Sequence, residues 1–297
     1  MPLRRMMARM TVAAALAGLL GAAGTAGAET AARADTLPEA GPWQATGSYL
    51  VSSLFQNQGL ATVRTSGGGS YLWYDGNVVP PATVAAGWNH VGDPDSIRGY
   101  VAEPYQSGAA VPTAKMFRIW KPVPFAQPVD FTHRLAAGEA MNNSFSAISP
   151  DAQWLVSGEW DTESRLLIFP MPLINPVAQD PAQDLPLTGR ILLDTPVTKV
   201  QGCDFRTATR LLCSSDDAAA GKPLLQIDLA HKLTGSDVAG HVTTLGRLPL
   251  RSACPSDPSG YETEGLDYDH VTGVLRVQVV QPGLCVALTT VWEFRHR

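Results

Sequence analysis

Three features of this sequence predict an all-β fold arranged as a single β-propeller of five blades. A polar cluster, a turn and a β-prone apolar run recur together, and the runs begin near residues 59, 99, 154, 210 and 274. A strand-containing repeat of roughly 40 to 64 residues is typical of propeller blades. The chain has 23 prolines spread along it, and no window keeps a helical period of about 3.6 residues. A sixth, irregular blade within residues 70–90 or 170–200 is the alternative.

Strands are expected where β-branched and aromatic residues run between turn-forming segments. Turn compositions such as Gln56-Asn57-Gln58-Gly59 separate the first of them. In chain order the expected strands cover residues 49–54, 61–64, 71–74, 99–102, 116–120, 144–148, 154–157, 166–169, 190–193, 211–213, 224–227, 274–280 and 286–294. Proline-rich residues 170–189 are expected to form a long outer loop. The run 287–294 should pair with N-terminal material and close the ring, which leaves no long sheet edge open.

The first 34 residues have the features of a secretory signal peptide. Arg4, Arg5 and Arg9 give a basic start, and residues 11–23 form an uncharged apolar run too short to span a bilayer stably. The sequence therefore divides into a processed segment, residues 1–34, and one secreted domain, residues 35–297. No stable membrane span is expected after processing. An uncleaved membrane anchor is the alternative, and the export route, Sec or Tat, stays open.

Four cysteines in an exported chain predict two disulfide bonds. Three pairings are possible, and we favour Cys203–Cys213 with Cys254–Cys285. The first pair flanks an expected strand–turn–strand, where cross-strand partners come close enough to bridge. The second pair would tie the loop before Glu262 to the last strands. A thiolate metal site is the alternative, but the chain has no CxxC spacing.

The charge distribution argues against a nucleic-acid partner. The net charge is −5, and no Lys- or Arg-rich run follows the signal segment. We expect a monomer whose partner is a small molecule or a glycan.

Short turn motifs resemble those of known propellers. Ser149-Pro150-Asp151-Ala152-Gln153-Trp154 is similar to the SPDG-x-W turn of WD40-like bacterial propellers, with alanine in place of the usual glycine. Glu262-Thr263-Glu264-Gly265-Leu266 resembles the E-x-EGL segment of several secreted propeller proteins. Residues 87–105 and 142–160 together resemble an uncharacterised family of secreted bacterial propellers. The resemblance implies a fold and supplies no activity.

Propeller geometry predicts where the functional residues gather. Inner strands start on one face and second strands end there, so residues from every blade should meet around one mouth of the channel. The expected ring comprises Asn89, Asn143, Gln201 and Glu264, with His90, Ser144 and Glu262 beside them and Glu103, Glu159, Trp160, Asp216 and Asp217 at the ends of second strands. It would form a mouth of amides and carboxylates rimmed by aromatic rings.

The favoured hypothesis is recognition of an extracytoplasmic small molecule or glycan at this acidic mouth. Trp160 would offer a flat apolar face to sugar C–H groups, while amides fix the orientation of the ligand. The ligand-binding candidates are Asn89, Asn143, Gln201, Glu262, Trp160 and Glu103. A protein-binding scaffold that uses the blade rims is a further alternative.

A glycosidase-like hydrolase is the runner-up. Glu159 and Glu264 would face each other across the mouth and divide the acid and base roles, with His90 and Asp93 as further participants. Five-bladed arabinanases use three acidic residues on this face, but Asp93, Glu159 and Glu264 lie in no recognisable arabinanase motif. The alternative interpretation is that Glu159 and Asp216 simply rim the mouth as solvated charges.

The same ring could hold a calcium ion, because this cation accepts six to eight oxygen ligands in flexible geometry. Glu264, Asn89, Asn143 and Gln201 would supply the oxygens. The alternative is that these groups bond one another and ordered water within the channel.

Overall fold

The computed structural model describes residues 38–121, 126–258 and 260–297, and it is all-β, as predicted. The expected signal segment, residues 1–34, lies outside the described residues. The described chain forms β1 to β19 with one short α-helix, α2 (Pro81–Ala85), and two 3-10 helices, η1 (Ala218–Ala220) and η2 (Gly283–Cys285). In this part of the chain, no helix is long and apolar enough to cross a membrane.

A hairpin and a five-stranded sheet make up the first part of the described chain. The hairpin pairs β2 (Gly59–Arg64) with β3 (Ser70–Asp75). The sheet has the order β4-β6-β7-β8, and β5 also pairs with β6. Its strands are β4 (Trp88–Val91), β5 (Asp95–Ile97), β6 (Tyr100–Ser107), β7 (Ala114–Trp120) and β8 (Val129–Arg134). All pairings in this part are antiparallel.

The middle of the chain forms one sheet of eight strands in the order β13-β14-β15-β16-β12-β11-β10-β9. Its strands are β9 (Ala147–Ile148), β10 (Trp154–Ser157), β11 (Thr162–Pro170), β12 (Gly189–Thr198), β13 (Val200–Thr207), β14 (Arg210–Ser215), β15 (Pro223–Leu229) and β16 (Val238–Arg247). A parallel pairing of β12 with β16 joins two antiparallel halves. The end strands β9 and β13 contact each other, so the sheet is nearly closed and barrel-like.

The last sheet combines the two ends of the described chain. Its order is β1-β19-β18-β17, with β1 (Trp43–Ser52), β17 (Glu262–Asp269), β18 (Val274–Val280) and β19 (Leu288–His296). Strand β1 runs antiparallel to β19 from the pair Trp43–His296 to the pair Ser52–Leu288. This is the pairing of C-terminal with N-terminal material that the sequence predicts.

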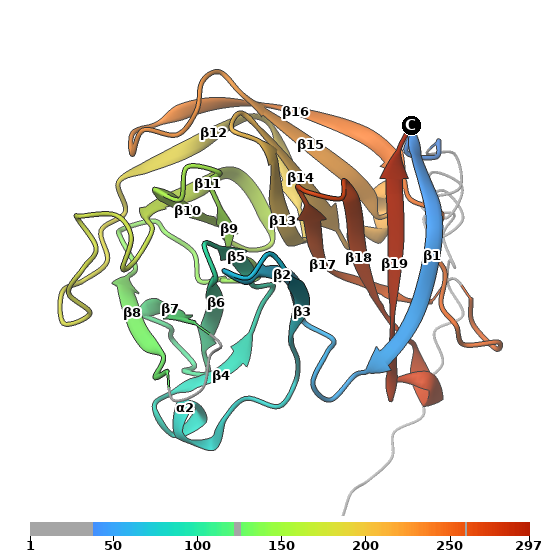
Figure 1. Ribbon diagram of the computed structural model, residues 1–297, viewed down its shortest axis with the longest axis horizontal. Coiled ribbons are helices and arrows are strands. Elements are labelled where there is room, and N and C mark those ends of the chain that lie inside the picture. The colour runs from blue at the N-terminus through green and yellow to red at the C-terminus, as the bar shows by residue number, and fades with distance from the viewer. Residues whose placement is uncertain (1–37, 122–125, 259) are drawn as a thin grey trace, which may run out of the picture.

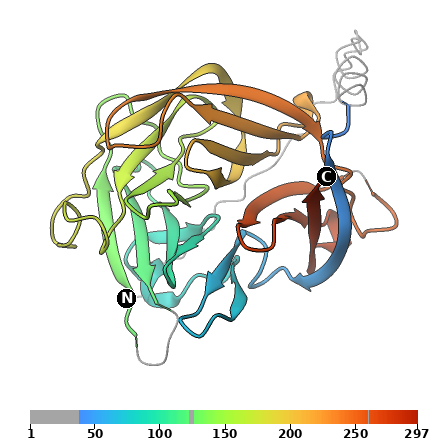
Figure 2. The same cartoon turned by 45° about the horizontal axis from the view of Figure 1, so that its top comes forward.

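The sheets are arranged around a shared centre (Figure 1, Figure 2). The innermost strands contact one another in the cyclic order β2, β5, β9, β13, β17 and back to β2. Residues far apart in the sequence therefore meet at one axis.

Apolar clusters fill the spaces within and between the sheets. One lies inside the eight-stranded sheet and includes Phe145, Ile168 and Phe205. A second joins β7, β8 and β11 through Phe117, Phe131 and Phe169 and also buries Met171, Ala178 and Leu185. These last three belong to the proline-rich segment expected to be an outer loop, so part of that loop is packed into the core. A third cluster includes Leu212, Leu275 and Phe294.

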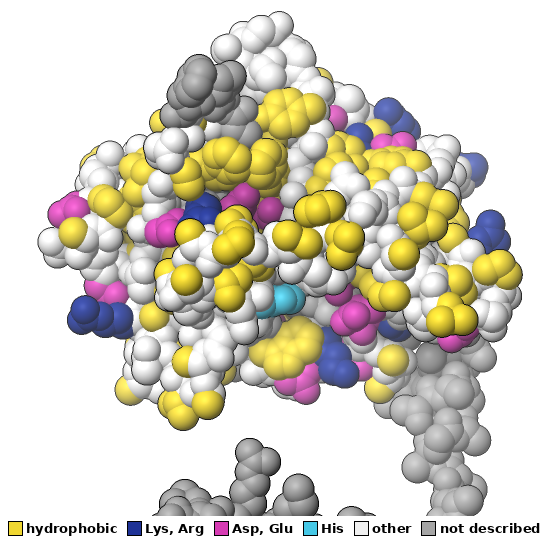
Figure 3. All heavy atoms as spheres, turned by 90° about the horizontal axis from the view of Figure 1, so that it is seen from below, with side chains coloured by type: hydrophobic (Ala, Val, Ile, Leu, Met, Phe, Trp, Pro, Cys, Tyr) yellow, Lys and Arg dark blue, Asp and Glu magenta, His cyan; other side chains and the backbone are white. Residues whose placement is uncertain are grey.

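The surface mixes side-chain types. On the side drawn in Figure 3, hydrophobic side chains are interspersed with acidic, basic and neutral polar ones.

Both predicted disulfide bonds are confirmed. Cys203 and Cys213 face each other across β13 and β14, with their Cα atoms 4.1 Å apart. Cys254 and Cys285 join the loop before β17 to the loop before β19, with a Cα–Cα distance of 5.6 Å. Two disulfides are typical of proteins that fold in an oxidising compartment.

Candidate functional site

Asp93 occupies the centre of the ring of sheets. It is fully buried, and its carboxylate oxygens accept hydrogen bonds from the backbone N–H groups of Leu60 and Leu266, each at 3.0 Å. Burial raises the pKa of Asp93 well above its usual range, although the two hydrogen bonds offset part of this effect. Asp93 was a catalytic candidate in the sequence, but the structure gives it bonds to β2 and β17 at the central axis.

Glycines from three strands surround this carboxylate. A Cβ atom on Gly59, Gly202 or Gly265 would lie 2.2 to 2.4 Å from an atom of Asp93. Real Cβ atoms do not come so close, so any side chain there would collide with Asp93. Backbone and carboxylate are therefore tightly packed against each other at the axis.

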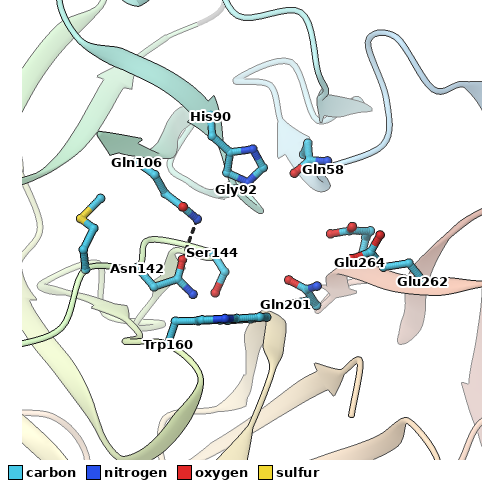
Figure 4. Close-up of a pocket in the computed structure, with 11 residues that line it drawn as sticks. Gln58, His90, Gly92, Gln106, Asn142, Ser144, Trp160, Gln201, Glu262 and Glu264 are labelled. Carbon is cyan, nitrogen blue, oxygen red and sulfur yellow. Dashed lines mark hydrogen bonds between the residues drawn. The ribbon is translucent and has the colours of Figure 1, made fainter. Parts of the chain in front are cut away.

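The residues just before these glycines line the first pocket, which has a volume of about 400 Å³. Its lining consists of Gln58, His90, Gly92, Gln106, Met141, Asn142, Ser144, Trp160, Gln201, Glu262 and Glu264 (Figure 4). Pockets of about 300–1,000 Å³ are typical of small-molecule sites. Of the residues expected at the mouth, His90, Ser144, Gln201, Glu262, Glu264 and Trp160 lie here.

Glu264 is the most unusual group of this pocket. Its side chain comes from β17 and points into the pocket beside that of Glu262 (Figure 4), and the residue is only 6 % exposed. Within the described residues, no side chain or loop N–H donates to its carboxyl group, and the Ser214 hydroxyl donates to the Glu264 backbone oxygen instead. Burial raises the pKa of Glu264 well above its usual range, and the charges of Glu262 and Asp216 add to this effect.

Glu262 and Asp216 add negative charge beside Glu264. Burial, followed by the charge of Asp216, raises the pKa of Glu262. Asp216 itself is ion-paired with Lys222 and accepts the N–H of Thr263 at 2.8 Å. The carboxyl groups that lack a cationic partner are thus the two that line the pocket.

Amides and an imidazole form the wall that faces these acids. Gln106 Nε2 donates to Asn142 Oδ1 at 2.6 Å, and the Asn142 Nδ2 group is buried without a partner in the described part of the chain. Burial lowers the pKa of His90, so its imidazole is neutral at pH 7. Among the lining residues there is no lysine or arginine.

Trp160 supplies the aromatic surface of the pocket. It follows β10, and 41 % of its surface is exposed. Figure 4 shows the indole edge-on along one wall, so that its flat face is turned to the interior opposite His90 and Gln58.

The four residues expected to hold calcium do not gather at one point. Asn143 is fully buried, where its Nδ2 donates to the backbone oxygens of Tyr105 and Met116 at 3.2 and 2.9 Å and its Oδ1 accepts from Ser157. Asn89 is exposed, and its side chain lies against Gly108 outside the pocket. Only Gln201 and Glu264 of the four reach the lining. Across residues 38–121, 126–258 and 260–297, no three His, Cys, Asp or Glu side chains form a metal-binding group.

Two other acidic candidates have structural partners away from the lining. Glu159 receives hydrogen bonds from Arg165 at 2.6 and 3.0 Å and from the Ala140 N–H at 2.6 Å. Burial alone would raise the pKa of Glu159, but these donors outweigh it and lower the pKa. Glu103 accepts the indole N–H groups of Trp73 and Trp120, each at 3.2 Å, and lines a different pocket.

A second pocket has a volume of about 390 Å³ and is lined by four aspartates that sequence reasoning missed. Three of them accept a backbone N–H from the next inner strand. Asp95 accepts from Ile148 at 2.5 Å, and Asp204 accepts from Tyr268 at 2.7 Å. Asp267 accepts from Thr62 at 2.7 Å. These bonds join neighbouring sheets, so we assign the three aspartates to the architecture.

Comparison with known proteins adds no relative. No family model matches the chain, and no curated protein matches it. The chemistry of the first pocket is therefore the basis for assigning a function.

Proposed function

We propose that this protein binds a small polyhydroxylated molecule, such as a sugar or a short segment of a glycan, in the pocket between Trp160 and Glu264. The observation that carries the proposal is an exposed indole face opposite polar groups that lack protein partners. Sugars present C–H groups on one face and hydroxyl groups around their edge, which matches an aromatic wall facing amides and acids.

The polar wall has unused hydrogen-bonding capacity. The Glu264 carboxyl has no donor within the described chain, and the Asn142 Nδ2 group there has no acceptor. Buried polar groups without partners cost about 1–3 kcal/mol each. A ligand that supplies hydroxyl groups would recover part of this free energy.

The positions of Glu159 and Glu264, the expected acid pair, favour binding over hydrolysis. Glu159 is occupied by Arg165 and does not face Glu264 across the pocket. Glu262 and Glu264 lie on the same strand and the same wall, whereas a glycosidase places its two carboxyls on either side of the scissile bond. A calcium ion is not required by this proposal.

We also propose that the sheets are the five blades of a propeller, with the β2–β3 hairpin as a reduced blade. The cyclic contacts of the five innermost strands and the pairing of β1 with β19 support this interpretation. Export of the protein is part of the same proposal and is supported by the two disulfide bonds.

The proposal is tested by titrating neutral oligosaccharides into the purified protein and measuring heat. Trp160→Ala should weaken binding at least about tenfold, since stacking on the indole is lost. Tyr71→Ala is the matched control, because Tyr71 is an aromatic residue of similar exposure, 39 %, that does not line this pocket. Absence of binding across a panel of hexose, pentose, N-acetylhexosamine and hexosamine oligomers would refute the proposal.

A further inference from the structure

We infer that the ligand of this pocket carries a cationic amine that Glu262 and Glu264 bind, so that the site selects amino sugars over neutral sugars. The inference rests on the proposed function and specifies its substrate class.

The first argument is the missing donor at Glu264. Other buried carboxyl groups near the axis have donors: Asp93 has two backbone N–H groups, and Asp267 has Thr62 and Arg276. Glu264 is as buried as these groups, yet its carboxyl faces the pocket and receives no hydrogen bond from the described residues. The pocket is therefore the side from which a ligand can donate to this carboxyl group.

The second argument is charge. Glu262 and Glu264 stand side by side, and the basic residues near them lie outside the lining. Lys222 is bound to Asp216 and to the Tyr261 carbonyl, and Lys199 acts on Glu262 only through its charge. These lysines act on the two acids from outside the lining, so a hydroxyl ligand would leave both acids without a cation in direct contact. An ammonium group supplies both a charge and up to three donors.

The third argument is the opposite wall. The face of Trp160 attracts cations as well as C–H groups. His90 on β4, which is neutral at pH 7, and the amides of Gln58 and Gln201 add no positive charge that would repel an amine. An amino sugar thus fits both walls of the pocket at once.

Binding of an amine at Glu264 should be coupled to the release of a proton. Burial raises the pKa of Glu264 well above its usual range, so its carboxyl group keeps a proton to a higher pH than an exposed glutamate does. An ammonium ion favours the ionised carboxylate, and binding releases that proton to the solvent. Affinity should therefore rise with pH while the amine itself stays protonated. Titrations in two buffers of different ionisation enthalpy measure the number of protons released.

The experiment compares three tetramers with the same β-1,4 backbone, built from glucosamine, N-acetylglucosamine or glucose. At pH 6.5 and 150 mM salt, we expect the glucosamine tetramer to bind at least about tenfold more tightly than the other two, because a charged hydrogen bond is about twice as strong as a neutral one. Glu264→Gln should remove this preference, so that the variant binds the glucosamine and glucose tetramers with affinities within about threefold of each other. Glu262→Gln, at a more exposed position, should reduce the preference even if Glu264→Gln does not fold.

Asp237→Asn controls for attraction of a polycation to an acidic protein, since it removes an exposed charge outside the pocket. Equal affinity of wild-type protein for the three tetramers, with dependence on Trp160 retained, would overturn the amine inference and leave the proposed function standing. A preference for the amine that survives both glutamate substitutions would overturn it as well. Failure of every tetramer and of the wider panel to bind would overturn the proposed function itself.

Discussion

Asp93 and Leu266 lie 173 positions apart in the chain, yet the Asp93 Oδ2 atom accepts a 3.0 Å hydrogen bond from the Leu266 N–H. The other carboxylate oxygen accepts from Leu60, so one side chain joins β2 and β17 to the segment that precedes β5. A single buried acid thus links β17, which carries Glu262 and Glu264, to the first hairpin.

Replacing Asp93 should therefore destabilise the whole domain. Asp93→Ala leaves two buried N–H groups without acceptors, at about 1–3 kcal/mol each, so we expect the free energy of unfolding to fall by about 2–6 kcal/mol. Asp93→Asn retains one acceptor oxygen and should lose less. Urea unfolding measures both variants. An Asp93→Ala protein within about 0.5 kcal/mol of wild type would contradict the bridging role.

The substitution Gly265→Ala tests how closely the backbone of β17 approaches Asp93. The Cβ of Gly265→Ala would lie 2.2 Å from Asp93 Oδ1 and 2.5 Å from Gly59 Cα. Because backbone must move to relieve this contact, we expect a loss of at least about 2 kcal/mol in thermal or urea unfolding. Gly67→Ala, with no atom closer than 4.0 Å to its new Cβ, is the matched control and should be nearly neutral. Equal stability of the two variants would show that the axis is not closed by this contact.

Glu163 should make stability depend on pH. Burial raises the pKa of Glu163 to about 8, although the Glu159 N–H and Lys115 pull it down. The unfolded chain ionises this group near its usual value of about 4.3, so unfolding releases a proton between that value and pH 8. The free energy of unfolding should then fall as pH rises through this window and level off above it.

The matched variant is Glu163→Gln, which has the shape of the protonated acid. Urea unfolding at pH 5, 6, 7 and 8 should show a shallower decline for the variant, with a difference in slope of up to about 1.4 kcal/mol per pH unit. Other buried acids affect the pH dependence of unfolding equally in both proteins, so their contributions cancel in the comparison. Parallel pH profiles for the two proteins would show that Glu163 is ionised throughout.

The disulfide bonds give a further prediction. Thiol alkylation of the unfolded, unreduced protein should label no cysteine, because all four are paired. Replacing Cys254 and Cys285 together by alanine should lower the free energy of unfolding by about 2–4 kcal/mol, and reduction of that variant should lower it again through Cys203–Cys213. Labelling of any cysteine before reduction would disprove the pairing.

Much of the fold could be predicted from the sequence, because alternating apolar residues and turn compositions are local signals. The all-β class, both disulfide pairs and the pairing of residues 287–294 with N-terminal material were accessible in this way. Strand β16 was missed, since Gly240, His241 and Gly246 dilute its β-prone residues. Its place is set by the neighbours β15 and β12, which a local pattern does not reveal.

Local sequence patterns also predicted part of the pocket. Gln201-Gly202 and Glu264-Gly265 place a polar side chain directly before a glycine at the axis, and Gln58-Gly59 repeats that pattern although it was not recognised. Asn143 looked equivalent in the sequence, but its side chain turns into the core to bond the backbone of β6 and β7. Which way an amide turns depends on unpaired carbonyl groups in other sheets, and the sequence does not show these.

The pairing of β1 with β19 has a consequence for how the molecule is made. Synthesis delivers the chain from its N-terminus onward, so β1 emerges long before the strand that it pairs with. The pairing that closes the ring of sheets cannot form until β19 has been made. Until then, β1 and the edge of β18 remain unpaired and can bind chaperones or pair with wrong strands.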